Sequence, residues 1–278
     1  MRVLYLQSLK VGYNVARTLT HKHSADADSS GAPAVTRAAA ILRLLARHDE
    51  PLGVNSIAKE LNLVPSTCLH ILRALAAESF VYVDPASKLY SLDAGLLPLA
   101  QKIMRQDDFG QRVVPFLESF ATDFGVTAVG VRVTGLRHMV VLALSQPNVA
   151  FRLYVEIGSH FPALISATGR CCAAFGHHDP KAIKGAFSEL HWDRPPTLKD
   201  WLAEVEDAKK AGFSIDNGRY LRGITVVAAP VFNRNGQMSH ALTTVGLSER
   251  LDKTIVQKMG NALKQAGLEL SHGQPANS

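Results

Sequence analysis

The chain has 278 residues, a hydrophobic fraction of 47% and a formal net charge of +6. This length and apolar content predict two globular domains, each with its own core. The three cysteines lack the spacing of a disulfide framework, which favours a reducing compartment. No run of apolar residues reaches the ~20 residues that a helix needs to span a bilayer. We therefore expect a cytoplasmic protein and exclude disulfide-rich secreted proteins and membrane-spanning proteins.

Residues 1–33 do not fit into either expected domain. They carry four basic residues and no acidic residue before Asp26, and polar residues interrupt any apolar core that a secretory signal would need. The polar composition of 21–33 is typical of disorder. We expect a disordered N-terminal extension over 1–33; the alternative is a basic arm that lies in a neighbouring groove of the DNA.

Two short helices are expected at the start of residues 34–93. The run 34–50 carries apolar residues at helical spacing, and the sequence Pro-Leu-Gly at 51–53 interrupts it. A second helix is expected over 56–62, with Ser56 at its N-cap position.

A third helix and a hairpin complete this module. After a tight turn, Pro65 favours the first turn of a helix with the sequence PSTCLHILRALAAES. Alternating residues at 80–83 and 88–92 flank a turn and predict a small hairpin. The order of these elements over 34–93 is that of a winged helix-turn-helix, whose third helix enters the major groove of DNA.

The third helix has an apolar face and a mixed polar face. Cys68, Leu72 and Leu75 share the face that is expected to pack on the other helices. On the opposite face, hydroxyl groups suit phosphate, Arg73 suits phosphate or guanine, and Leu69 suits a thymine methyl group. For any single residue, a solvated surface is an equal alternative. The residues expected to contact double-stranded DNA are Arg37, Ser56, Pro65, Ser66, Thr67, Leu69, His70, Arg73, Lys88 and Tyr90.

The charge of the module is nearly balanced. Residues 35–105 hold eight basic and six acidic side chains. A single copy is therefore expected to bind DNA weakly and with a modest salt dependence. Useful affinity would require two or more copies on one operator, which predicts a homodimer or homotetramer.

The rest of the chain alternates between helical and strand patterns. Helices are expected over 94–108 as a linker, and over 110–125, 167–176, 179–189, 197–211 and 252–270. Strands are expected over 127–133, 138–145, 151–157, 224–232 and 239–247. Grouped strands with helices on their flanks favour an α+β domain over 109–272, built on an antiparallel sheet.

Three separate motifs resemble the IclR family of bacterial transcription regulators, from about residue 34 to residue 270. The first is TRAAAILRLLA followed by IAKELNLVPSTCLHILRALAAESFVYVD. The second is GSHFPALISATGRCCAAF at 158–175, and the third is AGFSIDNGRYLRGITVVAAPVFNRNGQMSHALTTVG at 211–246. The resemblance implies a winged helix-turn-helix and a GAF-like domain that binds a small effector, often an organic or aromatic acid. It also implies assembly into dimers or tetramers on operator DNA.

The resemblance also implies where the effector would bind. A helix start with free backbone N–H groups suits a carboxylate, and Thr243 and Val245 point to one face of a strand. For Val226 and Val245, packing in the core is the simpler interpretation, and Asp216 equally suits turn hydrogen bonds. The effector-binding residues implied in this way are Ile165, Ser166, Ala167, Thr168, Gly169, Asp216, Val226, Thr243 and Val245.

Two other chemistries are weakly indicated. Cys171 and Cys172 with His177 and His178 resemble a metal cluster, but adjacent helical residues project ~100° apart, so both thiols cannot easily face one ion. No nucleophile elbow, P-loop or HExxH motif occurs. We therefore expect no metal, no cofactor and no catalytic residues, and a regulator rather than an enzyme. The alternative is a metabolite-converting enzyme or a cysteine-based redox sensor with an accessory DNA-binding arm.

Overall fold

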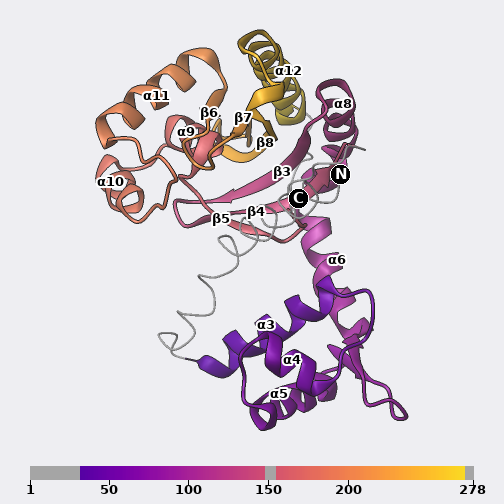
Figure 1. The fold of residues 1–278 in the computed structure, drawn as a ribbon. Helices are drawn as coiled ribbons and strands as arrows, with labels where there is room; N and C mark the ends of the chain where they lie inside the picture. The colour runs from indigo at the N-terminus through magenta and orange to yellow at the C-terminus, as the bar shows by residue number, and fades with distance from the viewer. Residues whose placement is uncertain (1–31, 148–154, 273–278) are drawn as a thin grey trace, which may run out of the picture. The chain divides into compact units, whose positions relative to one another are not determined.

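The computed structural model describes residues 32–147 and 155–272, and the chain divides into two compact units, Met1–Asp107 and Asp108–Ser278 (Figure 1). The extension expected over 1–33 lies, up to residue 31, outside the described residues. Across the described helices, none combines the length and the apolarity that crossing a bilayer demands.

The N-terminal unit contains three helices and a hairpin in the predicted order. The helices are α3 Pro33–Arg47, α4 Val54–Glu60 and α5 Pro65–Ala77, and the antiparallel strands are β1 Val81–Val83 and β2 Tyr90–Leu92. Ile41, Ile57 and Leu72 are fully buried at the centre of its core. Helical and strand periodicities in the sequence therefore predicted this unit correctly.

The expected N-cap of the second helix was wrong. Helix α4 begins at Val54 with Gly53 as its N-cap, so Ser56 is its third residue and makes no capping hydrogen bond. Leu52 forms a β-bridge with Tyr90, and its N–H donates to the Tyr90 carbonyl at 2.9 Å. Because this bridge fixes the chain directly before Gly53, the helix starts as soon as the bridge ends.

The linker segment and the next predicted helix are each divided. A 3₁₀ turn, η2 Ala94–Leu96, precedes α6 Leu97–Gln106. The helix expected over 110–125 consists of α7 Phe109–Arg112 and α8 Val114–Phe124. Pro115 lies in the first turn of α8, where its missing N–H does no harm, whereas inside one continuous helix it would remove a hydrogen bond.

The C-terminal unit is built on a six-stranded antiparallel sheet with the order β5-β4-β3-β8-β7-β6. The strands are β3 Thr127–Thr134, β4 His138–Ser145, β5 His160–Pro162, β6 Ser214–Asn217, β7 Ile224–Phe232 and β8 Met238–Leu247. The strand expected over 151–157 was misplaced. Residues 155–157 are not a strand and 151–154 lie outside the described residues, while the short β5 follows at 160–162. Strand β6 was not expected, because its four residues include Asp216 and Asn217.

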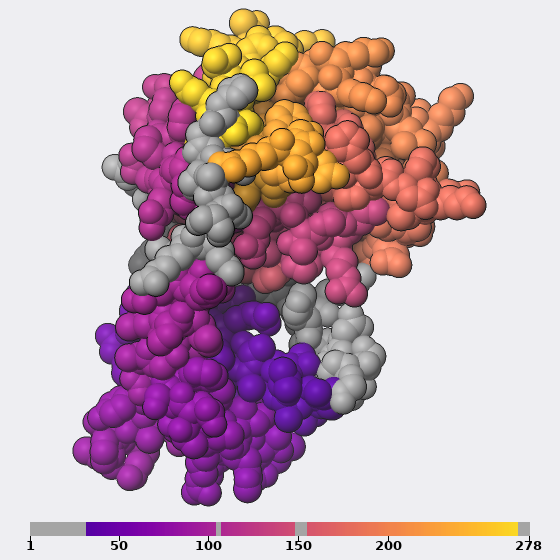
Figure 2. Space-filling model, turned by 180° about the vertical axis from the view of Figure 1, so that it is seen from behind, coloured from indigo at the N-terminus to yellow at the C-terminus, as the bar shows by residue number. Residues whose placement is uncertain are grey.

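Helices cover both faces of this sheet. On one face, α9 Ser166–Phe175, α10 Pro180–Ser188 and α11 Leu198–Ala211 enclose a core with Trp201 fully buried. On the other, α7, α8 and α12 Lys253–His272 enclose a second core (Figure 1). Figure 2 shows α8 and α12 side by side on the surface of this unit. Residues of β7 alternate between the two cores, Val226 facing the first and Val227 the second.

Candidate functional site

Helix α5 has the two faces that its sequence predicts. Its buried face consists of Cys68, Leu72 and Leu75. Six of the expected DNA contacts are exposed or half-buried on α5: Pro65, Ser66, Thr67, Leu69, His70 and Arg73. An open helix face with hydroxyls at its start and a guanidinium further along is suited to phosphate and base-edge contacts.

The wing differs from expectation at one residue. Tyr90 is 6% exposed and belongs to the core of the module, so it is corrected from a DNA contact to a core residue. The open aromatic side chain is Tyr82 on β1, which is 49% exposed. Val83 pairs with Tyr90 in the register, so Tyr82 points to the opposite face of the hairpin. Its neighbours Val81 and Val83 are apolar as well, so the residue types alone did not mark Tyr82 as the exposed member of the strand.

Other expected DNA contacts lie outside α5. Lys88 is exposed at the hairpin turn, and Ser56 is exposed on α4. Arg37 is half-buried on α3. The turn itself is held by Asp84, whose carboxylate accepts hydrogen bonds from the Ser87 N–H at 2.6 Å and the Ser87 hydroxyl at 2.7 Å. These bonds lower the pKa of Asp84 and keep it ionised.

A small cavity of about 60 Å³ lies in the C-terminal unit between the start of α9 and the sheet. Its other walls are mostly apolar side chains of β3 and β4, and include Tyr220 and Leu221 from the loop between β6 and β7. Six of the nine residues expected around an effector line this cavity: Ile165, Ser166, Thr168, Val226, Thr243 and Val245. We call this space the α9 cavity.

Three residues that carry hydroxyl groups border the α9 cavity from α9 and β8. Thr168 Oγ1 and Thr243 Oγ1 lie 2.9 Å apart and form a hydrogen bond between the helix and the strand. The Ser166 hydroxyl is buried and has no hydrogen-bond partner. The backbone of Ser166 also adopts φ +58°, a conformation that costs a non-glycine residue free energy. A buried hydroxyl without a hydrogen-bond partner lowers the stability of the fold, so a ligand that bonded to the Ser166 hydroxyl would recover this free energy.

Asp216, Ala167 and Gly169 do not line the α9 cavity, contrary to expectation. Ala167 packs in the core of this face. At Gly169, an added Cβ would lie 1.9 Å from the Leu164 carbonyl carbon, so only glycine permits this close approach. Both residues therefore position α9 rather than contact the cavity.

Asp216 contacts α9 and a loop. It is 1% exposed, and its Oδ2 accepts a hydrogen bond from Arg170 Nη1 at 3.1 Å. Its Oδ1 accepts the backbone N–H groups of Arg219 at 2.9 Å and Tyr220 at 3.2 Å. Arg170 in turn donates from Nε to Glu204 Oε2 at 2.6 Å. Asp216 therefore holds the loop that brings Tyr220 to the cavity, as its alternative interpretation predicted.

Tyr220 is a lining residue that the sequence reasoning missed. Burial raises the pKa of its hydroxyl, and the negative charges of Asp193 and Asp216 raise it further. The hydroxyl therefore stays protonated at physiological pH and remains a hydrogen-bond donor. Its position in the loop between two strands gave no periodic signal by which to find it.

The adjacent cysteines of α9 are buried. Cys171 and Cys172 are fully buried, and burial raises the pKa of Cys172 to about 12. Cys172 Sγ lies 3.6 Å from His178 Nε2, whose pKa burial lowers. In residues 32–147 and 155–272, no group of three or more His, Cys, Asp or Glu side chains is arranged to hold a metal ion.

Comparison with protein families identifies both units. Residues 34–85 match the IclR helix-turn-helix domain, and residues 101–272 match the family described as bacterial transcriptional regulator IclR C-terminal. The glycerol operon regulatory protein of Streptomyces griseus is 33% identical over 224 residues, which cover 77% of this chain and 85% of that protein.

Solved structures share the fold. A crystal structure of an IclR transcriptional regulator from Alicyclobacillus acidocaldarius is 28% identical, with a TM-score of 0.68, covering 86% of this chain and 98% of that one. An IclR homologue from Microbacterium hydrocarbonoxydans, crystallised with 4-hydroxybenzoate, is 15% identical with a TM-score of 0.68, covering 86% and 98%. At 15% identity, the second likeness concerns the fold alone. The chain belongs to the IclR family of bacterial transcription regulators, with an N-terminal helix-turn-helix domain and a C-terminal IclR domain.

Proposed function

We propose that a small organic or aromatic acid binds in the α9 cavity and modulates the binding of this regulator to operator DNA. The observation that carries the proposal is the buried Ser166 hydroxyl, which lines the cavity without a hydrogen-bond partner. Clefts with apolar walls and a few convergent polar groups are the usual form of small-molecule sites.

The polar groups of the cavity favour an acid. Ser166 and Thr168 lie in the first turn of α9, where backbone N–H groups have no intrahelical acceptor and the helix dipole is positive. The lining includes no Lys, Arg or His, so these N–H groups and the hydroxyls of Ser166, Thr168 and Tyr220 would meet a carboxylate. The remaining walls suit a ring or hydrocarbon. The Microbacterium homologue crystallised with 4-hydroxybenzoate is in keeping with this class of ligand.

The small size of the α9 cavity would couple the binding of an acid to a change in conformation. Its volume of about 60 Å³ is well below the ~150 Å³ of a cavity known to hold benzene. An aromatic acid would therefore move at least one wall, and the loop with Tyr220 and Leu221 is an irregular segment among the walls. A ligand shifts an equilibrium only by its differential affinity for the two states, and this displaced wall would provide that difference.

We expect the DNA-bound form to be a homodimer or homotetramer in the cytoplasm. The balanced charge of the module limits the affinity of one copy for DNA. Helix α6 exposes three large apolar side chains, Leu97, Leu99 and Ile103, at 58%, 55% and 51%. Such a group of exposed apolar residues favours a protein–protein contact.

The test uses the full chain and selects the operator experimentally. DNA that binds the protein would be isolated from a random-sequence library, and a panel of organic and aromatic acids would be screened by thermal shift. The proposal predicts an acid that raises the unfolding midpoint and changes the mobility of the protein–DNA complex without being consumed. Chemical turnover of the acid would instead support the enzyme alternative, and an acid that binds without any effect on DNA binding would refute the regulatory role.

A further inference from the structure

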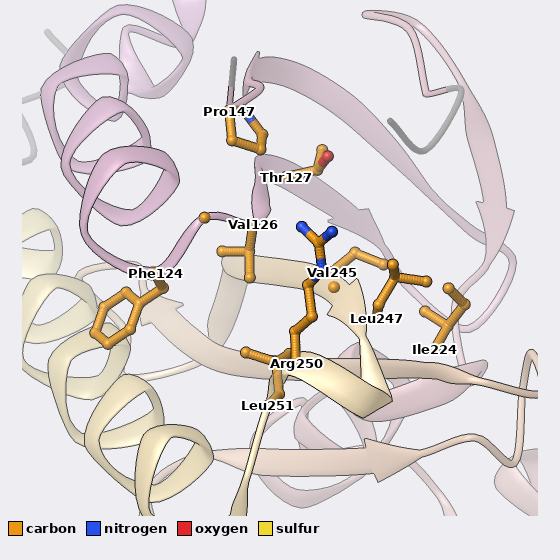
Figure 3. Close-up of a pocket in the computed structure, with 11 residues that line it drawn as sticks. Phe124, Val126, Thr127, Pro147, Ile224, Val245, Leu247, Arg250 and Leu251 are labelled. Atoms are coloured by element: carbon orange, nitrogen blue, oxygen red, sulfur yellow. The ribbon is translucent and has the colours of Figure 1, made fainter. Parts of the chain in front are cut away.

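A second and larger cavity lies at one end of the sheet, where β3 begins and β8 ends. Its volume is about 180 Å³. Phe124 and Gly125 border it from the end of α8, and Arg250 borders it from the 3₁₀ turn η3 Ser248–Arg250 (Figure 3). We call it the Arg250 pocket. Val245 is its single lining residue in common with the α9 cavity, so the two cavities have otherwise separate walls.

The walls of the Arg250 pocket are largely apolar. Val126, Leu247 and Leu251 are among them, and Thr127, which is 3% exposed, adds a hydroxyl group. Figure 3 shows the Arg250 side chain extending past Val126 with its guanidinium directed toward Thr127. The pocket therefore combines apolar side chains with polar groups and with the cation of Arg250 at its edge.

Arg250 is exposed, and no ion pair joins it to a carboxylate in the parts of the chain that the structure describes. Its guanidinium is thus available for a charged ligand. The planar fork of donors on an arginine matches the two oxygens of a carboxylate in a bidentate pair. Because Arg250 is exposed while Val126 and Leu251 are buried, a carboxylate would face the solvent and an apolar body would fill the interior.

We propose that the Arg250 pocket is a second ligand site, which takes a small monocarboxylate with an apolar body of about the size of a benzene ring. A volume of about 180 Å³ exceeds the ~150 Å³ of a cavity known to hold benzene, so such a body enters without displacing a wall. An inorganic anion would pair with the guanidinium but leave the apolar walls unfilled. The site is separate from the α9 cavity, and its existence does not depend on the proposed function.

The test is a titration of 4-fluorobenzoate into the full chain, followed by fluorine NMR. Arg250→Met keeps much of the side-chain length and removes the charge, and Arg250→Lys keeps the charge without the fork. Arg250 is exposed and makes no ion pair in the described structure, so both variants should unfold at the temperature of the wild type. Thr243→Val serves as the matched control, because Thr243 lines the α9 cavity and not the Arg250 pocket.

The expected result is a bound fluorine resonance that Thr243→Val leaves unchanged. Because the pair would lie at the solvent, Arg250→Met should weaken this binding by about twofold to fivefold, and Arg250→Lys should restore part of it. Equal binding to the wild type and Arg250→Met, or no bound resonance at millimolar ligand, would overturn the proposal. So would displacement by inorganic phosphate at a similar affinity. A single bound resonance that is lost in Thr243→Val but kept in Arg250→Met would also overturn it, while supporting the proposed function at the α9 cavity.

Discussion

Arg170 and Asp216 form a buried ion pair that joins α9 to β6, with Arg170 Nη1 and Asp216 Oδ2 3.1 Å apart. Their side chains are 1% and 0% exposed. Arg170 also pairs with the half-buried Glu204 on α11, and Asp216 also accepts two backbone N–H groups of the loop before β7. The pair thus fixes the helix that begins at the α9 cavity and the loop that carries Tyr220.

Asp216→Asn should therefore destabilise the protein strongly. It leaves the Arg170 guanidinium buried with one of its two carboxylates, and breaking a buried pair typically costs about 3–5 kcal/mol in the free energy of unfolding. Urea denaturation measures this value. Glu204→Gln, at a carboxylate that is 28% exposed, should cost less because solvent screens the charge. If Asp216→Asn lowered the free energy of unfolding by no more than Glu204→Gln does, the structural role assigned to the pair of Arg170 and Asp216 would be contradicted.

The three cysteines should be unreactive in the folded protein. All of them are 0% exposed, and burial raises the pKa of Cys172 to about 12, so almost no thiolate is present near neutral pH. Alkylation with iodoacetamide, counted by mass spectrometry, should be far slower in the native than in the unfolded chain. Ser188→Cys introduces an exposed thiol that should react at once and serves as the control. Rapid native labelling of Cys171 or Cys172 would favour the redox-sensor alternative.

Arg73→Ala and Ser66→Ala should weaken operator binding without unfolding the protein, because both side chains are exposed on α5. Loss of Arg73 should cost about 1–3 kcal/mol and relax specificity at one base if the guanidinium contacts guanine. If the guanidinium instead contacts a phosphate, the slope of the logarithm of the binding constant against the logarithm of salt concentration should become shallower by about one. Fluorescence anisotropy with labelled DNA distinguishes these outcomes. Lys210→Ala removes the same charge at an exposed residue of the other unit, so it should leave DNA binding unchanged. Unchanged DNA binding by both α5 variants would exclude the exposed face of α5 as the DNA contact.

Self-association should be detectable by sedimentation at micromolar concentration. The full chain is expected to be a dimer or tetramer, because the balanced charge of one DNA-binding module gives little affinity alone. Replacing the exposed Leu99 by Lys should reduce association if the exposed apolar residues of α6 contribute to it. A strictly monomeric full chain would contradict the prediction.

Periodicity predicted most of the fold because most elements have one buried face. The helices of the N-terminal unit and the long strands β7 and β8 follow the apolar patterns of their sequences. Thr168 and Thr243, 75 residues apart, were expected together through the resemblance to a family, and the structure places their hydroxyls in contact. Spacing alone gave no means of pairing them.

The elements that could not be predicted depend on contacts between distant segments. Strand β6 is recognisable only by its pairing with β7, and Asp216 is directed by Arg170 rather than by its own neighbours. Tyr90 is buried because it pairs with Val83 on the face that meets the helices, whereas the alternation of β2 alone left its face undecided. The Arg250 pocket joins the ends of three strands, and no local pattern marked it.

Operator binding by the wild type and Thr243→Val, measured across a titration of an acid found in the thermal-shift screen, tests the regulatory site most directly. Thr243→Val removes one hydroxyl with little change in volume, so the acid should bind more weakly by about 0.5–1.5 kcal/mol, or about 1.5–3 kcal/mol if the hydroxyl meets a charged group. Without the acid, both proteins should bind the operator equally, because Thr243 lies outside the DNA-binding unit. With it, the change in operator binding should require a higher acid concentration in Thr243→Val. An identical response of the two proteins would show that the effector does not bind in the α9 cavity.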